Sequence, residues 1–341
     1  CAADKNFSIF GATRKDADLF NFEATKKLIT DFSPDIIINS AAKVGGILAN
    51  NTYRTNFLIE NIKINLNILE SCIAYPGIKI INLGSSCIYP LDSANPISEK
   101  EFMNGKLEPT NSPYAMAKLT SIELGNAMKL EYGHRVINLM PTNLYGPNDN
   151  FSKKDSHVIP GLIVRMHDAK INGSTSFDIW GTGKPLREFL YSEDLASSIE
   201  FIIENNIEEE LINIGSGEEI SIYNLSQLIK STVGYEGDLL FDSSKPDGNP
   251  RKLLDSQLIN SLGWKSKTSL ENGLMYTYKW VLKNFEVGFS QVGLINPSFI
   301  KIFSLFANSK SLSTIIFTKS SKLVLSFQPN SVFAFVESPK R

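Results

Sequence analysis

The sequence has few cysteines, no long apolar run and little net charge, and each shortage excludes a class of protein. It has only three cysteines, Cys1, Cys72 and Cys87, which are too few for a disulfide framework and cannot all pair. Their scarcity favours a reducing compartment. No apolar run reaches the roughly 20 residues of a membrane-spanning helix, and no signal peptide opens the chain. A formal net charge of −2 provides no basic face for nucleic acid. We therefore expect a cytoplasmic protein with neither a membrane nor a nucleic-acid partner.

Short apolar runs alternate with longer amphipathic segments over most of the chain. Strands that are buried on both faces of a parallel sheet need no alternation of their own, and helices connect them. The pattern therefore predicts a Rossmann-type, doubly wound parallel sheet of the α/β class. The expected strands are 35–39, 79–83 and 135–140, and the expected helices are 24–32, 57–74, 113–132, 158–170, 193–205, 222–233 and 270–283.

Long loops rich in Asn, Pro and Gly lie around residues 145–156 and 243–251. They predict a smaller second lobe over the carboxyl ends of the strands. We expect residues 1–150 to form the dinucleotide-binding domain, with 187–217 returning to it, and 151–285 to form mainly a substrate-binding lobe.

The glycine-rich turn of a dinucleotide-binding domain is missing. Such a domain normally opens with a strand, a G-x-G-x-x-G turn and a helix, because glycine lets the backbone approach the pyrophosphate of the cofactor. Gly11 is the only early glycine, and the chain begins at Cys1 without an initiator methionine. We therefore expect a truncated domain that starts near its second strand, around residues 7–10, binds its cofactor weakly and has impaired activity.

The tail, residues 286–341, differs in composition from the rest of the chain. It is rich in Ser and Phe, and its six basic and two acidic residues give it a net charge of +4, so that the remainder carries −6. Such asymmetry is typical of an interaction tail. The alternative, which we favour, is sequence that never belonged to the fold.

A tyrosine and a lysine four residues apart, Tyr114 and Lys118, share one face of an expected helix. A lysine ammonium favours phenolate, so it should lower the pKa of the tyrosine towards a value useful for proton transfer to a carbonyl being reduced. The spacing alone is a weak signal, because Tyr75 and Lys79 share it, although Pro76 forbids a helix there. The alternative is a solvated helix face.

A second element supports the catalytic interpretation. The expected strand at 79–83 ends in Gly84-Ser85-Ser86-Cys87, which puts small hydroxyl side chains at the carboxyl edge of the sheet, where ligands bind. Ser85 can there donate to the same carbonyl oxygen that Tyr114 protonates. The alternative is a tight Gly-Ser turn.

Several blocks of sequence follow one another in the order typical of one family. The blocks are Ser40-Ala-Ala-Lys-Val-Gly-Gly-Ile-Leu-Ala-Asn-Asn-Thr-Tyr53, Leu83-Gly-Ser-Ser-Cys-Ile-Tyr-Pro90, Glu108-Pro-Thr-Asn111, Met140-Pro-Thr-Asn-Leu-Tyr-Gly-Pro147, Ser156-His-Val-Ile-Pro160, Trp180-Gly-Thr-Gly183, Arg187-Glu-Phe-Leu190 and Lys245-Pro-Asp-Gly-Asn-Pro-Arg-Lys-Leu-Leu-Asp255. From about Arg14 to Phe285 the chain resembles the GDP-L-fucose synthases, a family of extended short-chain dehydrogenase/reductases.

The resemblance implies NADPH-dependent 3,5-epimerisation and 4-reduction of GDP-4-keto-6-deoxy-D-mannose to GDP-L-fucose. It implies that Cys87 and His157 are the acid/base pair of the epimerisations. It also implies that Ser85, Tyr114 and Lys118 catalyse the reduction and that Lys118 binds the nicotinamide ribose. Plainer alternatives exist, because a free cysteine is most often a small buried hydrophobe and a lone histidine beside a helix start is usually structural.

The resemblance also implies residues that bind cofactor and substrate, with no metal ligand among them. An arginine suits a pyrophosphate because its guanidinium binds two oxygens at once, although Arg165 can also be read as a solvated helix-face residue. Arg14 matches the position at which members of the family contact the adenosine 2′-phosphate of the cofactor, which favours NADP(H) over NAD. The implied substrate residues are Asn143, Arg165, Trp180, Arg187 and Asp247, and the implied cofactor residues are Arg14, Ala41, Ala42, Leu83, Gly84, Ser85, Ser86, Lys118, Pro141, Thr142, Asn143, Leu144 and His157.

Two other functions stay open. One is a different nucleotide-sugar epimerase or dehydratase of the same superfamily, although an epimerase that works only at the 4-position needs no pair such as Cys87 and His157. The other is a catalytically silent fragment, because the cofactor turn is missing. The helices expected at 57–74 and 113–132 resemble those that pair two subunits in this superfamily, so we expect a homodimer.

Overall fold

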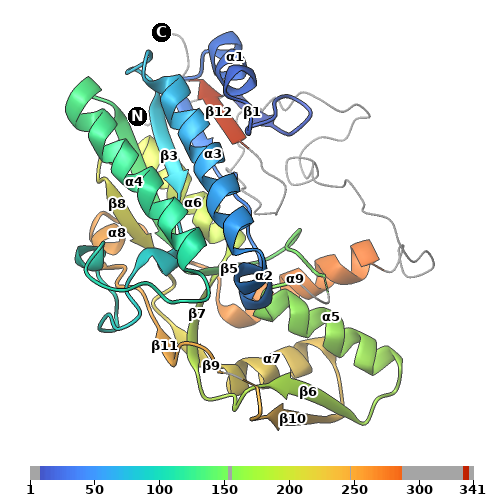
Figure 1. Cartoon of the computed structure of the whole chain (residues 1–341). Helices are drawn as coiled ribbons and strands as arrows, with labels where there is room; N and C mark the ends of the chain where they lie inside the picture. The colour runs from blue at the N-terminus through green and yellow to red at the C-terminus, as the bar shows by residue number, and fades with distance from the viewer. Residues whose placement is uncertain (1–7, 153–155, 246, 286–332, 338–341) are drawn as a thin grey trace.

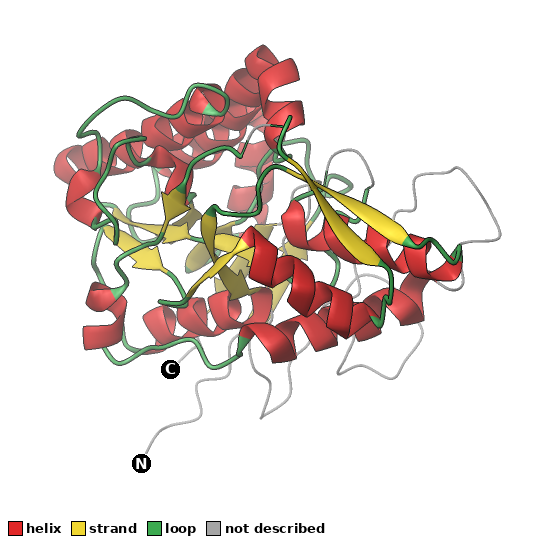
Figure 2. Ribbon diagram, turned by 90° about the horizontal axis from the view of Figure 1, so that it is seen from below, coloured by secondary structure: helices red, strands yellow, loops and turns green. Residues whose placement is uncertain are grey.

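Helices cover the central strands of the molecule on both sides (Figure 2). The computed structural model describes residues 8–152, 156–245, 247–285 and 333–337. Every helix predicted from the sequence forms, with each end within three residues of its expected place. The helices are α1 (Phe22–Phe32), α2 (Ile47–Thr52), α3 (Arg54–Cys72), α4 (Ser112–Tyr132), α5 (Val158–Ile171), α6 (Ser192–Glu204), α7 (Ile222–Val233), α8 (Gln257–Ser261) and α9 (Leu270–Phe285). The strands are β1 (Ser8–Ala12), β2 (Ile36–Asn39), β3 (Lys79–Leu83), β4 (Arg135–Pro141), β5 (Asn143–Tyr145), β6 (Ser176–Trp180), β7 (Leu186–Tyr191), β8 (Leu211–Ile214), β9 (Glu219–Ser221), β10 (Asp238–Asp242), β11 (Arg251–Lys252) and β12 (Phe333–Glu337).

The larger sheet has six strands in the order β1-β12-β2-β3-β4-β8, and β2, β3, β4 and β8 run parallel (Figure 1). Successive side chains of a strand point to opposite faces. Ile37 and Ile80 pack in the core formed with α1, α3 and α4, whereas Ile38 and Ile81 pack in the core formed with α6 and α8. This arrangement confirms the predicted doubly wound, Rossmann-type fold.

Strand β12, five residues of the tail, lies within the larger sheet, although we expected the tail to lie outside the fold. It lies between β1 and β2 and pairs antiparallel with both. A strand at this place gives hydrogen-bond partners to the backbone N–H and C=O groups that β1 and β2 turn towards each other, and buried backbone groups need such partners. The sheet is therefore mixed rather than purely parallel. The other residues of the tail lie outside the described part of the chain.

Asparagines on three neighbouring strands fix the register of the larger sheet. Asn39, Asn82 and Asn138 stand directly opposite one another on β2, β3 and β4. Asn82 accepts a hydrogen bond from Asn39 (2.9 Å) and donates one to Asn138 (3.2 Å). Asn39 also donates to Asn65 of α3, and Asn82 donates to Ser121 of α4. Because a buried amide that loses its partners is costly, this ladder opposes any shift in strand pairing.

A smaller lobe carries two further sheets. One is built on β7, which runs parallel to β5 and β11 and antiparallel to β9, and the other pairs β6 with β10. The helices α5, α7 and α9 pack on them around an apolar core. Within residues 187–217, which we expect to return to the cofactor domain, α6 packs against the larger sheet and β8 joins it, whereas β7 pairs with β5, which leaves that sheet directly after β4. Within the described ranges, no helix combines the length and apolar character needed to cross a membrane.

Candidate active site

A cavity of about 320 Å³ lies at the carboxyl ends of β2, β3 and β4. Parallel strands end together at this edge of the sheet, and the first residues of α4 and α5 also reach it. Six of the predicted site residues, Arg14, Ala41, Arg165, Trp180, Arg187 and Asp247, are not part of its lining. The predicted residues that line it are Ala42, Leu83, Gly84, Ser85, Ser86, Cys87, Tyr114, Lys118, Pro141, Thr142, Asn143, Leu144 and His157.

Ser85 and Cys87 share the turn that follows β3. The Ser85 hydroxyl accepts a hydrogen bond from the Cys87 N–H (3.3 Å), which caps a single helical turn at Ser86–Ile88. The Ser85 Oγ and the Cys87 Sγ are 2.8 Å apart. Cys72, by contrast, is buried in the apolar core, where desolvation raises the pKa of its thiol to about 12. Of the two cysteines that the structure describes, only Cys87 lines the cavity.

Tyr114 and Lys118 stand one turn apart on α4, as the sequence predicts. The Lys118 ammonium lies 5.9 Å from the centre of the Tyr114 ring and donates to the Leu83 carbonyl (2.7 Å). Burial lowers the pKa of Lys118 to about 8. Burial also raises the pKa of Tyr114, and the charge of Cys87 adds to that shift. The predicted lowering of the tyrosine pKa is therefore wrong, and Tyr114 is protonated at neutral pH.

His157 occupies the N-cap position of α5, but its side chain makes no capping hydrogen bond there. The residue as a whole is exposed to solvent, yet protein atoms crowd around the imidazole, and the resulting loss of hydration lowers its pKa. His157 is therefore neutral at neutral pH. Asp149, which the sequence did not single out, lines the same cavity, and burial raises the pKa of its carboxyl to about 7.

The sequence assigned no role to Lys252, Asn50 or Asn111, which also line the cavity. Burial lowers the pKa of Lys252, whereas the charge of Cys87 raises it. The side-chain oxygens of Asn50 and Asn111 are buried and have no hydrogen-bond partner among the described residues. A buried acceptor of this kind suits a ligand that brings donors. All three residues fall inside the quoted sequence blocks, which were the signal that could have found them.

Arg165 and Arg187, expected to hold the substrate, lie in the smaller lobe. Arg165 of α5 donates to the Gly161 carbonyl (3.2 Å), and its guanidinium is 5.2 Å from the centre of the Phe177 ring. Arg187 of β7 donates to the Leu186 carbonyl (2.8 Å). Burial lowers the pKa of both guanidiniums. Arg165 is therefore a partly buried residue rather than a solvated one.

Trp180 and Asp247 also belong to the smaller lobe. Trp180 ends β6 and has 64% of its surface exposed. The Asp247 carboxylate accepts both the N–H (2.6 Å) and the hydroxyl (2.7 Å) of Thr182, and these bonds lower its pKa. Arg14 is exposed and lines a separate, small cavity after β1, and Ala41 is wholly buried.

Comparisons with known proteins agree on one group of enzymes. A sequence profile of the NAD dependent epimerase/dehydratase family matches residues 2–215. GDP-L-fucose synthase 1 of Arabidopsis thaliana is 46% identical over 272 residues, which are 80% of this chain and 84% of that protein. GDP-L-fucose synthase of Escherichia coli K12 is 43% identical over 281 residues, 80% of this chain and 88% of that protein. The solved structure of a GDP-L-fucose synthetase from Naegleria fowleri bound to NADP has a TM-score of 0.72 and 32% identity, and the match covers 81% of this chain and 85% of that one.

Proposed function

This chain belongs to the NAD-dependent epimerase/dehydratase family and to the GDP-L-fucose synthases within it, and we propose that it converts GDP-4-keto-6-deoxy-D-mannose into GDP-L-fucose. The reaction inverts carbons 3 and 5 of the sugar and reduces the ketone at carbon 4 with NADPH. One observation carries the proposal: Cys87 and His157 line the same cavity as Ser85, Tyr114 and Lys118. An epimerase that works only at carbon 4 has no use for that additional pair.

The lining of the cavity fits the nicotinamide end of NADP(H). Lys118 uses one N–H for the Leu83 carbonyl, which leaves two for the hydroxyls of a ribose. The unpartnered oxygen of Asn50 offers a further acceptor. Bound NADPH supplies the hydride for the ketone carbon. The fit concerns this end only, because no G-x-G-x-x-G turn for the pyrophosphate occurs in the sequence.

The epimerisations need one group that removes a proton and one that returns it to the opposite side of the carbon. The ketone acidifies the protons on carbons 3 and 5, and removal of either leaves an enolate. We assign these roles to Cys87 and His157, because a thiol and a neutral imidazole both exchange protons readily near neutral pH. The Lys252 ammonium, close enough to Cys87 for their charges to interact, opposes the negative charge that forms.

The reduction ends with a proton on the oxygen at carbon 4. Tyr114 gives this proton, and the Ser85 hydroxyl donates to the same oxygen. The Lys118 ammonium then stabilises the phenolate that remains. Because Ser85 also contacts Cys87 (Oγ to Sγ, 2.8 Å), a ketone held by Ser85 and Tyr114 has its neighbouring carbons near Cys87.

The GDP part of the substrate belongs, in this proposal, to the smaller lobe, mainly residues 151–285, while residues 1–150 hold the cofactor. Arg165 and Arg187 supply positive charge for the pyrophosphate. Trp180 offers an exposed ring, and Asp247 is held in place by both bonds to Thr182. Asn143, which lines the cavity, connects the two parts.

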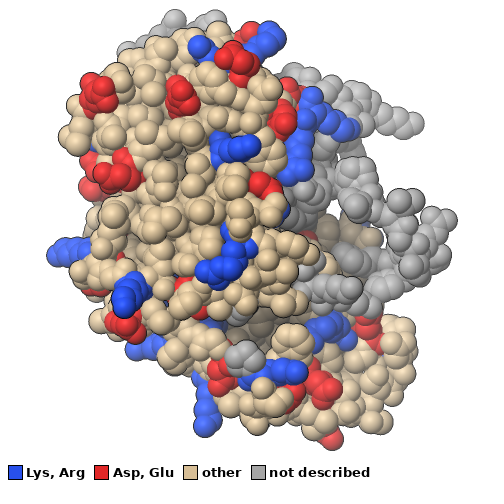
Figure 3. Space-filling view, viewed as in Figure 1, with Lys and Arg blue, Asp and Glu red and all other residues tan. Residues whose placement is uncertain are grey.

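Two copies of the chain form, in our proposal, a cytoplasmic homodimer through α3 and α4. These helices pack side by side and expose apolar side chains, Ile59 and Leu66 on α3 and Met116 and Leu130 on α4. Charged side chains are few and scattered over this face (Figure 3). Introducing Leu66→Glu should convert a dimer into monomers in size-exclusion chromatography with light scattering, and an unchanged mass contradicts this interface.

The experiment that tests the function is product identification. The chain is incubated with GDP-4-keto-6-deoxy-D-mannose and NADPH, and the sugar is identified by NMR. GDP-L-fucose is expected. A product epimerised at carbon 4 alone, or a substrate that returns unreduced, contradicts the proposal.

A further inference from the structure

A buried carboxylate outside the cavity joins the segments that build it. Glu188 of β7 is 0% exposed. One of its oxygens accepts the N–H of Gly217 (2.8 Å), and the other accepts the N–H of Leu254 (3.0 Å). A side chain at Gly215 would collide with this carboxylate, so the turn at 215–217 wraps closely around it. Glu188 therefore ties two loops, far apart in the sequence, to the centre of the small sheet.

The backbone of Glu188 holds a third segment. Its carbonyl accepts the Thr142 hydroxyl (3.2 Å) and the Asn143 side-chain amide (2.9 Å). Both of these residues line the cavity. One residue thus fixes the loop after β4 through its carbonyl and two other segments through its carboxylate.

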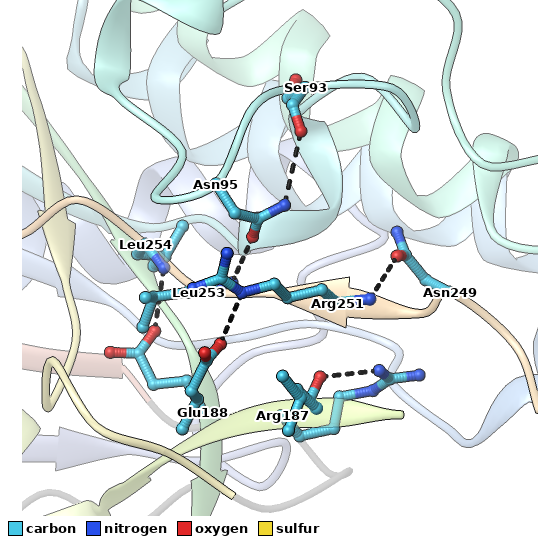
Figure 4. A network of polar contacts seen from close by, with 10 residues as sticks. Ser93, Asn95, Arg187, Glu188, Asn249, Arg251, Leu253 and Leu254 are labelled. Carbon is cyan, nitrogen blue, oxygen red and sulfur yellow. Dashed lines mark hydrogen bonds and ion pairs between the residues drawn. The ribbon is translucent and has the colours of Figure 1, made fainter. Parts of the chain in front are cut away.

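The Leu254 segment is the one that brings Lys252 to the cavity. Lys252 belongs to the two-residue strand β11 and stands opposite Arg187 of β7. The chain just after it exchanges backbone bonds with Ile97, and two side chains hold it as well: Leu254 donates to Glu188, and Leu253 donates to the Asn95 side chain (2.7 Å) from the other side (Figure 4). A strand of two residues has few ladder bonds of its own, so these two side chains help to fix where Lys252 lies.

The chemistry of the site requires a carboxylate rather than an amide. Both oxygens of Glu188 accept from a backbone N–H, whereas a glutamine has one acceptor oxygen and would turn its NH₂ group towards the other N–H. A buried charge is costly unless it is hydrogen-bonded and opposed by positive charge. Burial raises the pKa of Glu188, whereas the bonds from Leu254 and Gly217 favour its charged form.

We propose that Glu188 is a positioning residue of the reaction, which places the Lys252 ammonium in the cavity that Cys87 lines through the bond from Leu254 and locks that segment to the β7 strand that carries Arg187. This inference rests on the proposed function. Glu188 contacts no reacting atom, so its effect must pass through Lys252. The GDP end of the site and the proton-transfer end then form one rigid unit.

The test is a double-mutant cycle with Glu188→Gln and Lys252→Met, in the full chain. Glu188→Gln should lower kcat for deuterium exchange next to the ketone on the order of 100-fold, the cost of a misplacement of about 1 Å, with little change in KM for the GDP-sugar. In the Lys252→Met background the same substitution should cause no further loss. Glu219→Gln is the matched control. Glu219 stands opposite Glu188 on β9, but it accepts a hydrogen bond from the exposed side chain of Arg251 rather than from the backbone that follows Lys252. It should leave kcat unchanged.

A merely structural role gives different results. Glu188→Gln would then lower the melting temperature while kcat per folded molecule stayed the same, or its loss would add fully to that of Lys252→Met, and either result overturns the proposal. If Glu188→Gln does not fold, Asn95→Ala decides, because it releases the same segment at Leu253; its loss of kcat must vanish in the Lys252→Met background. Failure of the proposed function is distinguishable, since the unmodified chain would then form no GDP-L-fucose.

Discussion

The Ser85 hydroxyl and the Cys87 thiol lie 2.8 Å apart at the end of β3. In the proposed reaction, this contact places the donor for the ketone oxygen next to the proton-transfer group for the carbons beside the ketone. Epimerisation and reduction can therefore use one bound sugar without moving it. The two functions should still be separable by substitution, because different side chains carry them.

Replacing Tyr114 by Phe removes the proton donor and keeps the ring. Reduction should fall by roughly 10²- to 10⁴-fold, the usual contribution of general acid catalysis, while hydrogen exchange beside the ketone continues. NADPH oxidation and solvent deuterium incorporation, measured on the same sample, separate the two steps. Parallel loss of both contradicts the assignment of Tyr114 to reduction alone.

Replacing Cys87 by Ser exchanges a thiol for a hydroxyl, which is far too weak an acid to transfer the proton. Deuterium exchange should slow sharply while binding of the GDP-sugar changes little. Cys72→Ser is the matched control, because it buries a hydroxyl in the apolar core and should lower thermal stability without slowing exchange per folded molecule. A destabilised Cys87→Ser enzyme with full exchange would mean that Cys87 is structural.

The pH dependence of exchange reports on His157. Burial lowers its pKa, so the imidazole stays neutral to a pH below its ordinary value of about 6.5. Exchange should therefore persist below pH 6.5 and decline only as the ring becomes protonated at lower pH. His157→Gln should abolish this limb of the profile. An inflection at or above pH 6.5 in the unmodified enzyme argues against His157 as the base.

Lys118 should make stability depend on pH in the alkaline range. Its pKa is lowered by burial from 10.5 to about 8 in the folded state, so between these values the unfolded chain binds a proton that the folded chain does not. The free energy of unfolding therefore rises with pH across this window, by an amount on the order of 3 kcal/mol. This contribution is lost again as the pH falls from 10.5 through 8. The free energy of unfolding of the unmodified chain, measured by urea unfolding from pH 7 to pH 10.5, should rise by this amount relative to that of Lys118→Met. A difference that stays flat means that the ammonium is not desolvated.

The sequence predicts the helices and the edge at which the site forms better than it predicts the charges there. Tyr114 and Ser85 could be brought together from sequence because parallel strands and the helices between them end at a common edge. Lys252 was not placed there, although it falls inside a quoted block, because periodicity does not show that its two-residue strand β11 pairs with β7. The direction of the Tyr114 pKa shift depends on the atoms around the ring, which periodicity does not reveal.

Strand β12 shows a second limit of sequence reasoning. The composition of the tail separates it from the rest of the chain, yet residues 333–337 lie within the larger sheet. Backbone hydrogen bonds hold a strand there, and these carry little signature in composition. The asparagine ladder was likewise missed, since Asn39, Asn82 and Asn138 align only once the strands are paired.

The position of solvent deuterium in the product tests the proposed reaction most directly. The full chain is supplied with GDP-4-keto-6-deoxy-D-mannose and unlabelled NADPH in D₂O, and the product is read by NMR. Two epimerisations through Cys87 and His157 followed by hydride transfer predict GDP-L-fucose with deuterium at carbons 3 and 5 and hydrogen at carbon 4. A reduced product that keeps the configuration of the substrate at carbons 3 and 5, with no deuterium on either, contradicts it.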